Sequence, residues 1–256
     1  MRVVIKVGTS TLAHATGKLN IRRASALCRV ISDLKNAGNE VILVSSGAIG
    51  MGVGKLSLTE KPKDIPTKQA AAAVGQCELM YTYDKLFSEY NHTVAQILIT
   101  GEDIDHADRR QNFENTMRRL LELSVLPIIN ENDSISTSEI EIGDNDTLGA
   151  IVATAINADL LVILSDIDGL FTADPHKEEN AKLLHTVAEI TPEIEGMIGG
   201  VGSKLGTGGM LTKIKAAKIV TENGIDMVIA NGNNPTALYD IVDGFDVGTR
   251  FLGRKN

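Results

Sequence analysis

Short apolar runs alternate along the chain with longer amphipathic stretches. The run Val3–Val7 carries apolar residues at neighbouring positions, a pattern typical of a strand that is covered on both faces in a parallel sheet. The stretch Ile21–Ala37 repeats apolar residues at helical spacing, and Gly38 follows it as a stop signal. Because strands and helices alternate throughout, the sequence predicts an α/β fold, a three-layer αβα sandwich on a mainly parallel central sheet.

The same two patterns mark the other elements. A polar stretch with interspersed isoleucines, Ser134–Ile142, is expected to form a protruding hairpin, and the alanines of Ala70–Ala73 predict close helix packing. Further strands are predicted at Val41–Val44, Thr93–Ile99, Val125–Ile129, Leu160–Leu164, Met227–Ala230 and Val247–Leu252, and further helices at Lys68–Tyr90, Asp108–Leu123, Thr147–Ala158, Met210–Glu222 and Pro235–Val242.

Lys6 is the single charge inside the first apolar run. Burying an unpaired ammonium costs several kcal/mol, so a lysine in this position is expected to face an anion. The turn Gly8-Thr9-Ser10 follows at the carboxyl end of the strand, where open α/β sheets bind ligands. The alternative is a lysine that reaches along the sheet to solvent. We favour a phosphate-facing lysine because lysines are rarely buried unpaired.

Small or polar residues also follow other predicted strands or precede helices. Ser45–Gly52 is a small-residue turn whose backbone N–H groups could hold a carboxylate or phosphate, or it could be a flexible connector. Gly143–Asp146 contains more capping-type residues than one helix cap needs, which favours a function. The glycine-rich stretch Gly199–Gly209 leads into a helix whose first turn carries Lys213, an arrangement suited to polyphosphate. These turns are predicted to gather along one edge of the sheet.

Composition limits the classes of function. The 256 residues, 43% of them hydrophobic, contain no linker or repeat and predict a single domain, 1–256. A net charge of −8 argues against a nucleic-acid partner but leaves small anionic substrates open. Cys28 and Cys77 are interpreted as small buried residues in a reducing cytoplasm. The histidines show no metal-ligand spacing, and neither a secretory pattern nor a membrane span is expected.

Common nucleotide-binding signatures are missing. Neither G-x-x-x-x-G-K-[ST] nor G-x-G-x-x-G occurs, which argues against a P-loop enzyme and a Rossmann dehydrogenase. The loop signature of a protein kinase is absent as well. Any nucleotide site must therefore be built from the other turns.

Six short segments occur in an order that resembles a known family. They are K-V-G-T-S at 6–10, S-S-G-A-I at 45–49, N-E-N-D at 130–133, G-D-N-D at 143–146, S-D-I-D-G-L at 165–170 and T-G-G-M-L-T-K at 207–213. Together they resemble the glutamate 5-kinases (γ-glutamyl kinases) of the amino acid kinase family, over nearly the whole chain. K-x-G and S-S-G-A are shared loosely across that family, whereas N-E-N-D, G-D-N-D and T-G-G-M-x-T-K are more specific to the glutamate enzymes.

The resemblance implies transfer of the γ-phosphoryl group of ATP to the side-chain carboxylate of L-glutamate. The product would be γ-glutamyl phosphate, the first intermediate of proline biosynthesis. A carboxylate acceptor is already ionised at neutral pH, so positioning and charge neutralisation by lysines, backbone N–H groups and phosphate-bound Mg²⁺ suffice. The residues that it implicates are Lys6 and Lys213 at the moving phosphoryl group, with Asp146 holding both lysines; Ser46, Asp133, Asn145 and Asp144 at glutamate; and Lys6, Gly8, Ser165, Asp166, Thr207, Gly208, Gly209, Met210, Leu211, Thr212 and Lys213 at ATP.

A site for an α-amino acid needs an acid for the ammonium and donors for the carboxylate. Asp133 is expected to supply the first, and Ser46, Asn145 and turn N–H groups the second. The resemblance also predicts proline as a feedback inhibitor and a homo-oligomer. Many family members carry a C-terminal PUA domain, which this chain, ending at Asn256, is expected to lack.

Two alternatives stay open. The first is another enzyme of this fold, such as an acetylglutamate, carbamate or uridylate kinase; N-E-N-D together with G-D-N-D favours free glutamate instead. The second is a non-catalytic sensor of an amino acid or a nucleotide. A sensor is expected to have lost a lysine or a carboxylate, whereas Lys6, Asp146 and Lys213 are all present.

Overall fold

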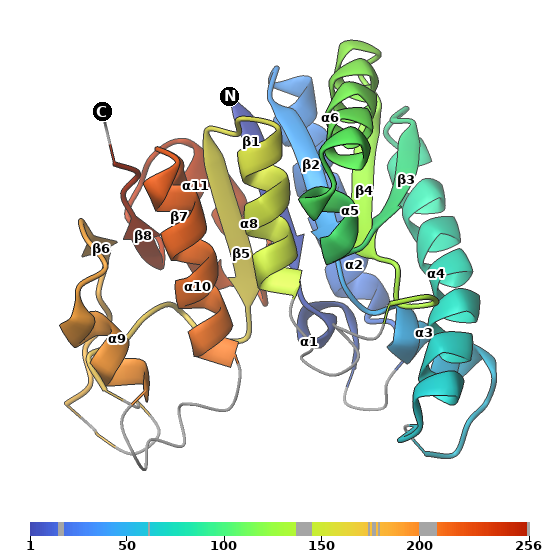
Figure 1. Ribbon diagram of the computed structural model, residues 1–256, viewed down its shortest axis with the longest axis horizontal. Helices are drawn as coiled ribbons and strands as arrows, with labels where there is room; N and C mark the ends of the chain where they lie inside the picture. Colours follow the sequence, from blue (N-terminus) through green and yellow to red (C-terminus); the bar gives the residue numbers. More distant parts are fainter. Residues whose placement is uncertain are drawn as a thin grey trace.

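The computed structural model of the chain describes residues 1–14, 18–60, 62–136, 145–173, 175, 178, 180–199 and 209–254, with only the backbone of 197–199. These residues form an eight-stranded sheet in the order β3-β4-β2-β1-β5-β7-β8-β6 (Figure 1). Neighbouring strands are parallel except for the antiparallel pair β7–β8. The strands are β1 (Arg2–Val7), β2 (Glu40–Ser45), β3 (Val94–Ile99), β4 (Leu126–Glu131), β5 (Leu160–Ser165), β6 (Thr186–Val187), β7 (Asp226–Asn231) and β8 (Thr249–Phe251).

Helices cover both faces of the sheet, which confirms the predicted α/β sandwich (Figure 1). One face packs against α6 (Ala107–Glu122), α8 (Asn145–Ala155) and α10 (Gly209–Glu222). The other packs against α2 (Ile21–Asn36), α4 (Ile65–Ser88) and α11 (Ala237–Val242). The shorter helices are α1 (Thr9–Leu12), α3 (Ala48–Lys55), α5 (Gly101–Asp105) and α9 (Pro192–Gly199).

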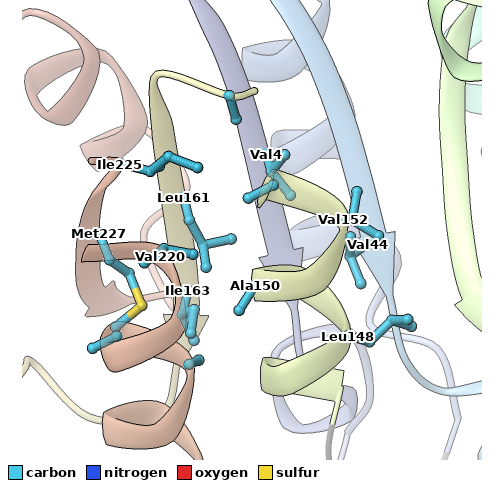
Figure 2. Close-up of a cluster of buried hydrophobic side chains, with 14 of the residues drawn as sticks. Val4, Val44, Leu148, Ala150, Val152, Leu161, Ile163, Val220, Ile225 and Met227 are labelled. Atoms are coloured by element: carbon cyan, nitrogen blue, oxygen red, sulfur yellow. The ribbon is translucent and has the colours of Figure 1, made fainter. Parts of the chain in front are cut away.

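The pleat of β1 divides the core into two clusters. Val3 and Ile5 point toward α2 and α4, whereas Val4 points toward α8 and α10. Figure 2 shows the cluster on the α8 and α10 side of the sheet, which includes Val4 of β1 and Leu161 of the neighbouring strand β5. Each such side chain contributes about 1.5–3 kcal/mol when fully buried. Lys6 has the same parity as Val4 and therefore belongs to the α8 and α10 side of the sheet.

Several sequence-based expectations need correction. Ser45–Gly52 is not one long turn, because α3 begins at Ala48 directly after Ser46 and Gly47. Ile21, expected on the buried face of α2, is 69% exposed in the first turn of that helix. Cys77 is exposed, whereas Cys28 is buried, and both thiols are free. The expected hairpin at Ser134–Ile142 lies outside the described residues from position 137 onward.

Element boundaries also differ in places. The helix expected from Thr147 begins at Asn145, and the helix expected from Pro235 begins at Ala237. Thr9 and Ser10 do not remain a turn but start the short helix α1. The elements α5, α9 and β6 were not predicted, since each is too short to show a clear apolar period. Within the described ranges, no helix combines the length and the apolar character needed to cross a bilayer.

Helices α3 and α4 touch through glycines, which confirms the close packing expected from the alanine run. A Cβ atom added to Gly75 would lie 1.8 Å from the carbonyl oxygen of Ala48, and one added to Gly52 would lie 1.8 Å from that of Ala71. Both helices therefore approach backbone to backbone. Because α3 starts right after Ser46, this contact sets the position of the Ser46 turn relative to α4.

Replacement of Gly75 with alanine is expected to destabilise the protein by about 1–3 kcal/mol or more, because the new methyl group overlaps a backbone carbonyl that cannot rotate away. The matched control is Gly54→Ala in α3, where nothing lies within 4 Å of an added Cβ. That variant should be stabilised by about 0.5–1 kcal/mol through lower chain entropy. Urea unfolding of both proteins measures the difference, and equal midpoints would contradict the predicted contact.

Candidate active site

The predicted site residues gather at the carboxyl ends of the central strands. Lys6 lies near the end of β1, Ser165 ends β5, and Ser46 follows β2. The chain passes from β1 to β2 on one side and later returns to β5 on the other side of β1. Open α/β sheets bind ligands at such a reversal of strand order. In Figure 1 this edge lies at the lower end of β5, where α8 begins.

Two lysines meet one carboxylate in the centre of this edge. Lys6 Nζ lies 2.7 Å from Asp146 Oδ1, and Lys213 Nζ lies 3.0 Å from Asp146 Oδ2. Lys213 Nζ also donates to the carbonyl oxygen of Gly209 at 3.2 Å. The exposed fractions of Lys6, Asp146 and Lys213 are 8%, 3% and 7%, so all three groups are buried. Their formal charges sum to +1, which favours binding of an anion.

The ionisation of Asp146 reflects two opposing effects. Burial alone would raise the pKa of this carboxyl group. The charges of Lys6 and Lys213, together with their hydrogen bonds, outweigh burial and hold the pKa of Asp146 below its usual range. Thr212 Oγ1 donates a further hydrogen bond to Asp146 Oδ2 at 2.8 Å. Asp146 therefore stays charged at neutral pH and orients both lysines.

Asn145 precedes Asp146 in the first turn of α8 and faces a different set of partners. Its Nδ2 donates to Ser46 Oγ at 2.7 Å, to Asn130 Oδ1 at 3.0 Å and to the Ser45 carbonyl oxygen at 3.3 Å. Asn145 Oδ1 is buried and has no hydrogen-bond partner among the described residues. The amide thus presents an acceptor, not the donor that we expected for a substrate carboxylate.

Asp133 lies beyond the end of β4 and is 7% exposed. Its Oδ1 atom is buried and, within the described part of the chain, has no hydrogen-bond partner. Burial, together with the charge of Glu131, raises the pKa of Asp133 to about 6. Burial also raises the pKa of Glu131, although hydrogen bonds from Ser136 and from the backbone of Gly101 oppose this effect. A cationic ligand group at Asp133 would offset both the burial of this carboxylate and its repulsion from Glu131.

Asp133 lines a cavity of about 250 Å³ between the ends of β3 and β4 and the helices α3 and α4. Gln76, Glu131 and Ser134 contribute polar groups to its wall, and Ala48 and Ala72 contribute apolar ones. A larger cavity of about 690 Å³ lies between α2 and the turn after β7. None of the predicted site residues line that larger cavity, so the chemistry indicated by the sequence belongs to the first region.

Some of the residues expected at ATP lie in the described part of the chain, and others lie outside it. Gly8 lies beside Lys6, because a Cβ added to it would lie 3.7 Å from Lys6 Nζ. Ser165 Oγ donates to Asp166 Oδ1 at 3.1 Å. Leu211 is exposed, whereas Met210 packs into the core beneath α10 and has only its backbone to offer a nucleotide. Asp144, Thr207 and Gly208, which the resemblance placed at glutamate and at ATP, lie outside the described residues.

Sequence reasoning missed two polar side chains of the site. Asn130, in the N-E-N-D segment, is 1% exposed and accepts the hydrogen bond from Asn145. Gln76 of α4 accepts a hydrogen bond from Asn130 Nδ2 at 3.0 Å. A polar residue at a buried helical position was the signal that could have revealed Gln76. In the described ranges, no group of three or more histidine, cysteine, aspartate or glutamate side chains is arranged to hold a metal ion.

Comparison with known proteins agrees with these features. The model of the amino acid kinase family matches residues 1–231. A glutamate 5-kinase of Clostridium perfringens is 56% identical over 99% of this chain and 96% of its own length. A glutamate 5-kinase of Caldanaerobacter subterraneus subsp. tengcongensis is 53% identical over the whole of this chain and 69% of its own length.

Solved structures share the fold at much lower identity. An isopentenyl phosphate kinase from T. acidophilum has a TM-score of 0.65 at 16% identity, covering 98% of this chain and all of the other. A UMP kinase from Bacillus anthracis has a TM-score of 0.66 at 17% identity, covering 99% of this chain and 96% of the other. The similarity to these two structures supports the fold alone. Membership of the family rests on the family model and on the relatives of more than 50% identity. The chain belongs to the amino acid kinase family, within the group formed by the glutamate 5-kinases.

Proposed function

We propose that this protein transfers the γ-phosphoryl group of ATP to the γ-carboxylate of L-glutamate, giving γ-glutamyl phosphate in the first step of proline biosynthesis. The observation that carries the proposal is the pair Asn145–Asp146 at the start of α8. Asp146 holds the two lysines on one side, and Asn145 contacts Ser46 of the proposed glutamate site on the other. The relatives named glutamate 5-kinase support this choice of acceptor.

Lys6 and Lys213 act on the transferred group by charge. Phosphoryl transfer spreads negative charge over the oxygens of the moving group, and fixed cations lower the energy of that state. Both ammonium groups are held by one carboxylate and are shielded from water. The glutamate γ-carboxylate has an ordinary pKa of about 4.3, so it is ionised at neutral pH and needs no general base.

The acceptor side suits the charges of an α-amino acid. Asp133 Oδ1 and Asn145 Oδ1 are two buried oxygens without hydrogen-bond partners among the described residues, and an ammonium group supplies the donors that they need. Ser46 and the turn that leads into α3 supply donors for the α-carboxylate. N-acetylation would remove the charge that pairs with Asp133, and aspartate is too short to present its carboxylate to the phosphoryl group.

Mg²⁺ is expected to enter with ATP on its phosphate oxygens, where it neutralises charge. The donor set fits this arrangement, because both oxygens of Asp146, the carboxylate between the two lysines, are already in contact with ammonium groups. The backbone near Gly8 and the start of α10 at Gly209 flank the lysines and would bind the phosphates.

The experiment that tests the proposal traps the acyl phosphate with hydroxylamine. The protein is incubated with ATP, Mg²⁺ and glutamate, N-acetylglutamate, aspartate or carbamate in turn, and a coupled ADP assay covers UMP. We expect hydroxamate from glutamate only and no ADP release with UMP. If glutamate gives no product while another acceptor does, the proposed substrate is wrong even though the fold stands. Absence of turnover with every acceptor would favour the sensor alternative.

We further propose that proline competes with glutamate, that the protein works in the cytoplasm, and that it assembles as a homo-oligomer. Proline carries the same α-carboxylate and a cationic amine, so it fits the same donors and acceptors. The free thiols of Cys28 and Cys77 accord with a reducing compartment. The strand β3 ends the sheet, and covering such an edge with a second copy would protect its backbone groups. Initial rates with added proline, at low and high glutamate, test the competition.

A further inference from the structure

Four side-chain amides form a continuous hydrogen-bonded row from the surface of the molecule to the acceptor site. Gln76 Nε2 donates to Gln96 Oε1 at 3.0 Å, and Asn130 Nδ2 donates to Gln76 Oε1 at 3.0 Å. Asn145 Nδ2 donates to Asn130 Oδ1 at 3.0 Å. Gln96 is exposed on β3, whereas the other three amides are buried. The row therefore runs inward and ends at Asn145.

The row has one polarity, and backbone atoms decide it. Asn130 Oδ1 accepts the backbone N–H of Glu131 at 3.0 Å, so its oxygen must occupy that position and its nitrogen must face Gln76. At the inner end, Asn145 Nδ2 meets the carbonyl oxygen of Ser45. A reversed Asn145 amide would bring its oxygen against two acceptor oxygens, at a cost of about 1–3 kcal/mol for a buried group without a partner.

We propose that Gln76 is a positioning residue for the acceptor site: through Asn130 it holds the Asn145 amide with Oδ1 directed to the substrate ammonium. This inference rests on the proposed function, since it assigns that oxygen to glutamate. Gln76 also lines the Asp133 cavity, but its Nε2 donates to Gln96 Oε1 and its Oε1 accepts from Asn130 Nδ2, so both of its polar atoms have partners within the row. Its own place is set by the neighbouring Gly75, where α4 lies against α3.

The effect of Gln76 should be specific to the ammonium. Asn145 Oδ1 is an acceptor, so it interacts with the charged amine and gains nothing from a carboxylate. The dicarboxylic acid glutarate, which is glutamate without its ammonium, would not use that oxygen. In the proposed function ATP binds at the lysines that Asp146 holds, so its KM should not depend on the row. A general loss of folding or packing would instead weaken all three ligands.

The test compares Gln76→Met, Gln76→Glu and the unaltered protein. The methionine side chain has a similar length and removes the acceptor for Asn130 Nδ2. The glutamate side chain of Gln76→Glu keeps an acceptor oxygen at that position. For Gln76→Met we expect the KM for glutamate to rise about tenfold. The KM for ATP, and the inhibition constant of glutarate as a competitor of glutamate, should stay within about twofold of their values in the unaltered protein. Gln76→Glu, measured at pH 8, should keep the KM for glutamate within about threefold of the unaltered protein. Gln111→Met, which removes an exposed amide contact to Asn115 on α6, is the matched control and should change none of these values.

Three outcomes would overturn the inference. One is an unchanged KM for glutamate in Gln76→Met, and another is an equal loss for glutamate and glutarate, which would indicate a merely structural role. The third is a Gln76→Glu protein as impaired as Gln76→Met. The unaltered protein decides the proposed function separately: if it forms no hydroxamate from glutamate, the substrate assignment fails before any variant is compared.

Discussion

Replacing Lys213 with alanine is expected to lower kcat by about 10²- to 10³-fold, the scale for losing one fixed electrostatic stabiliser of a transition state. Lys213 is one of two buried cations held by Asp146. Its loss brings the formal charge of the cluster from +1 to zero and, in the proposed function, leaves Lys6 as the one lysine of the cluster to stabilise the phosphoryl group. The KM for glutamate should change little, because the acceptor contacts lie on the Asn145 side of α8.

The matched control for this experiment is Lys215→Ala. Lys215 lies two residues further along α10 and is exposed, so its removal should leave kcat within about twofold. Steady-state rates and thermal unfolding of both variants separate a catalytic loss from a folding defect. A folded Lys213→Ala protein with nearly normal kcat would remove Lys213 from the phosphoryl-transfer site.

Asp133→Asn is expected to lower kcat/KM for glutamate by about 10²- to 10³-fold, since truncating one partner of a buried charge pair costs about 2–5 kcal/mol. The unaltered protein should show a matching pH dependence. The pKa of Asp133 is about 6, so the carboxylate that we propose to bind the ammonium is lost as the pH falls through 6. Between pH 6 and 5, kcat/KM should approach a tenfold fall per unit, and the Asp133→Asn profile should be flat there.

The same substitution should stabilise the fold at neutral pH. The pKa of Asp133 is raised in the folded state, so between pH 4 and 6 the folded protein binds more protons than the unfolded chain. The free energy of unfolding therefore falls as the pH rises through this window. At pH 8 the Asp133→Asn protein should be more stable by about 1–3 kcal/mol, and this gain should vanish near pH 4.

Denaturant unfolding at pH 4 and pH 8 measures the change, with Asp84→Asn as the control. Asp84 is an exposed carboxylate of α4, so its substitution should have little effect at either pH. If kcat/KM of the unaltered protein stays constant from pH 8 to 5, or if Asp133→Asn retains a normal KM, Asp133 does not bind the ammonium.

Local patterns were sufficient for most of the fold. Apolar residues dominate β1, β2 and β5, with Lys6 as the one charge within Val3–Val7, and such runs are typical of strands that helices cover on both faces of a parallel sheet. The amphipathic period of α2 likewise indicated its buried face, apart from Ile21 in the first turn. Lys6 stood out within its strand because a buried ammonium requires an anion.

Local patterns misled where a distant contact decides the structure. Gly50 and Gly52 weaken the local preference for a helix, and Ser45–Gly52 was expected to be a turn. In the folded protein the stretch from Ala48 onward belongs to α3, because α4 approaches it so closely that only glycine fits at Gly52. Residue spacing within one segment contains no information about that neighbour.

The candidate site shows the same division. From its residue types alone, the sequence determined a parallel α/β fold, a lysine that needs an anion, and turns rich in donors and carboxylates at strand ends. Only the tertiary structure decided that Asp146 engages Lys6 and Lys213 with opposite oxygens, and that Asn145 presents an acceptor. The reason is physical: hydrogen bonding and charge pairing depend on distance and direction, and the atoms that orient Asn145 belong to Ser45 and Asn130, which lie in two other elements, β2 and β4.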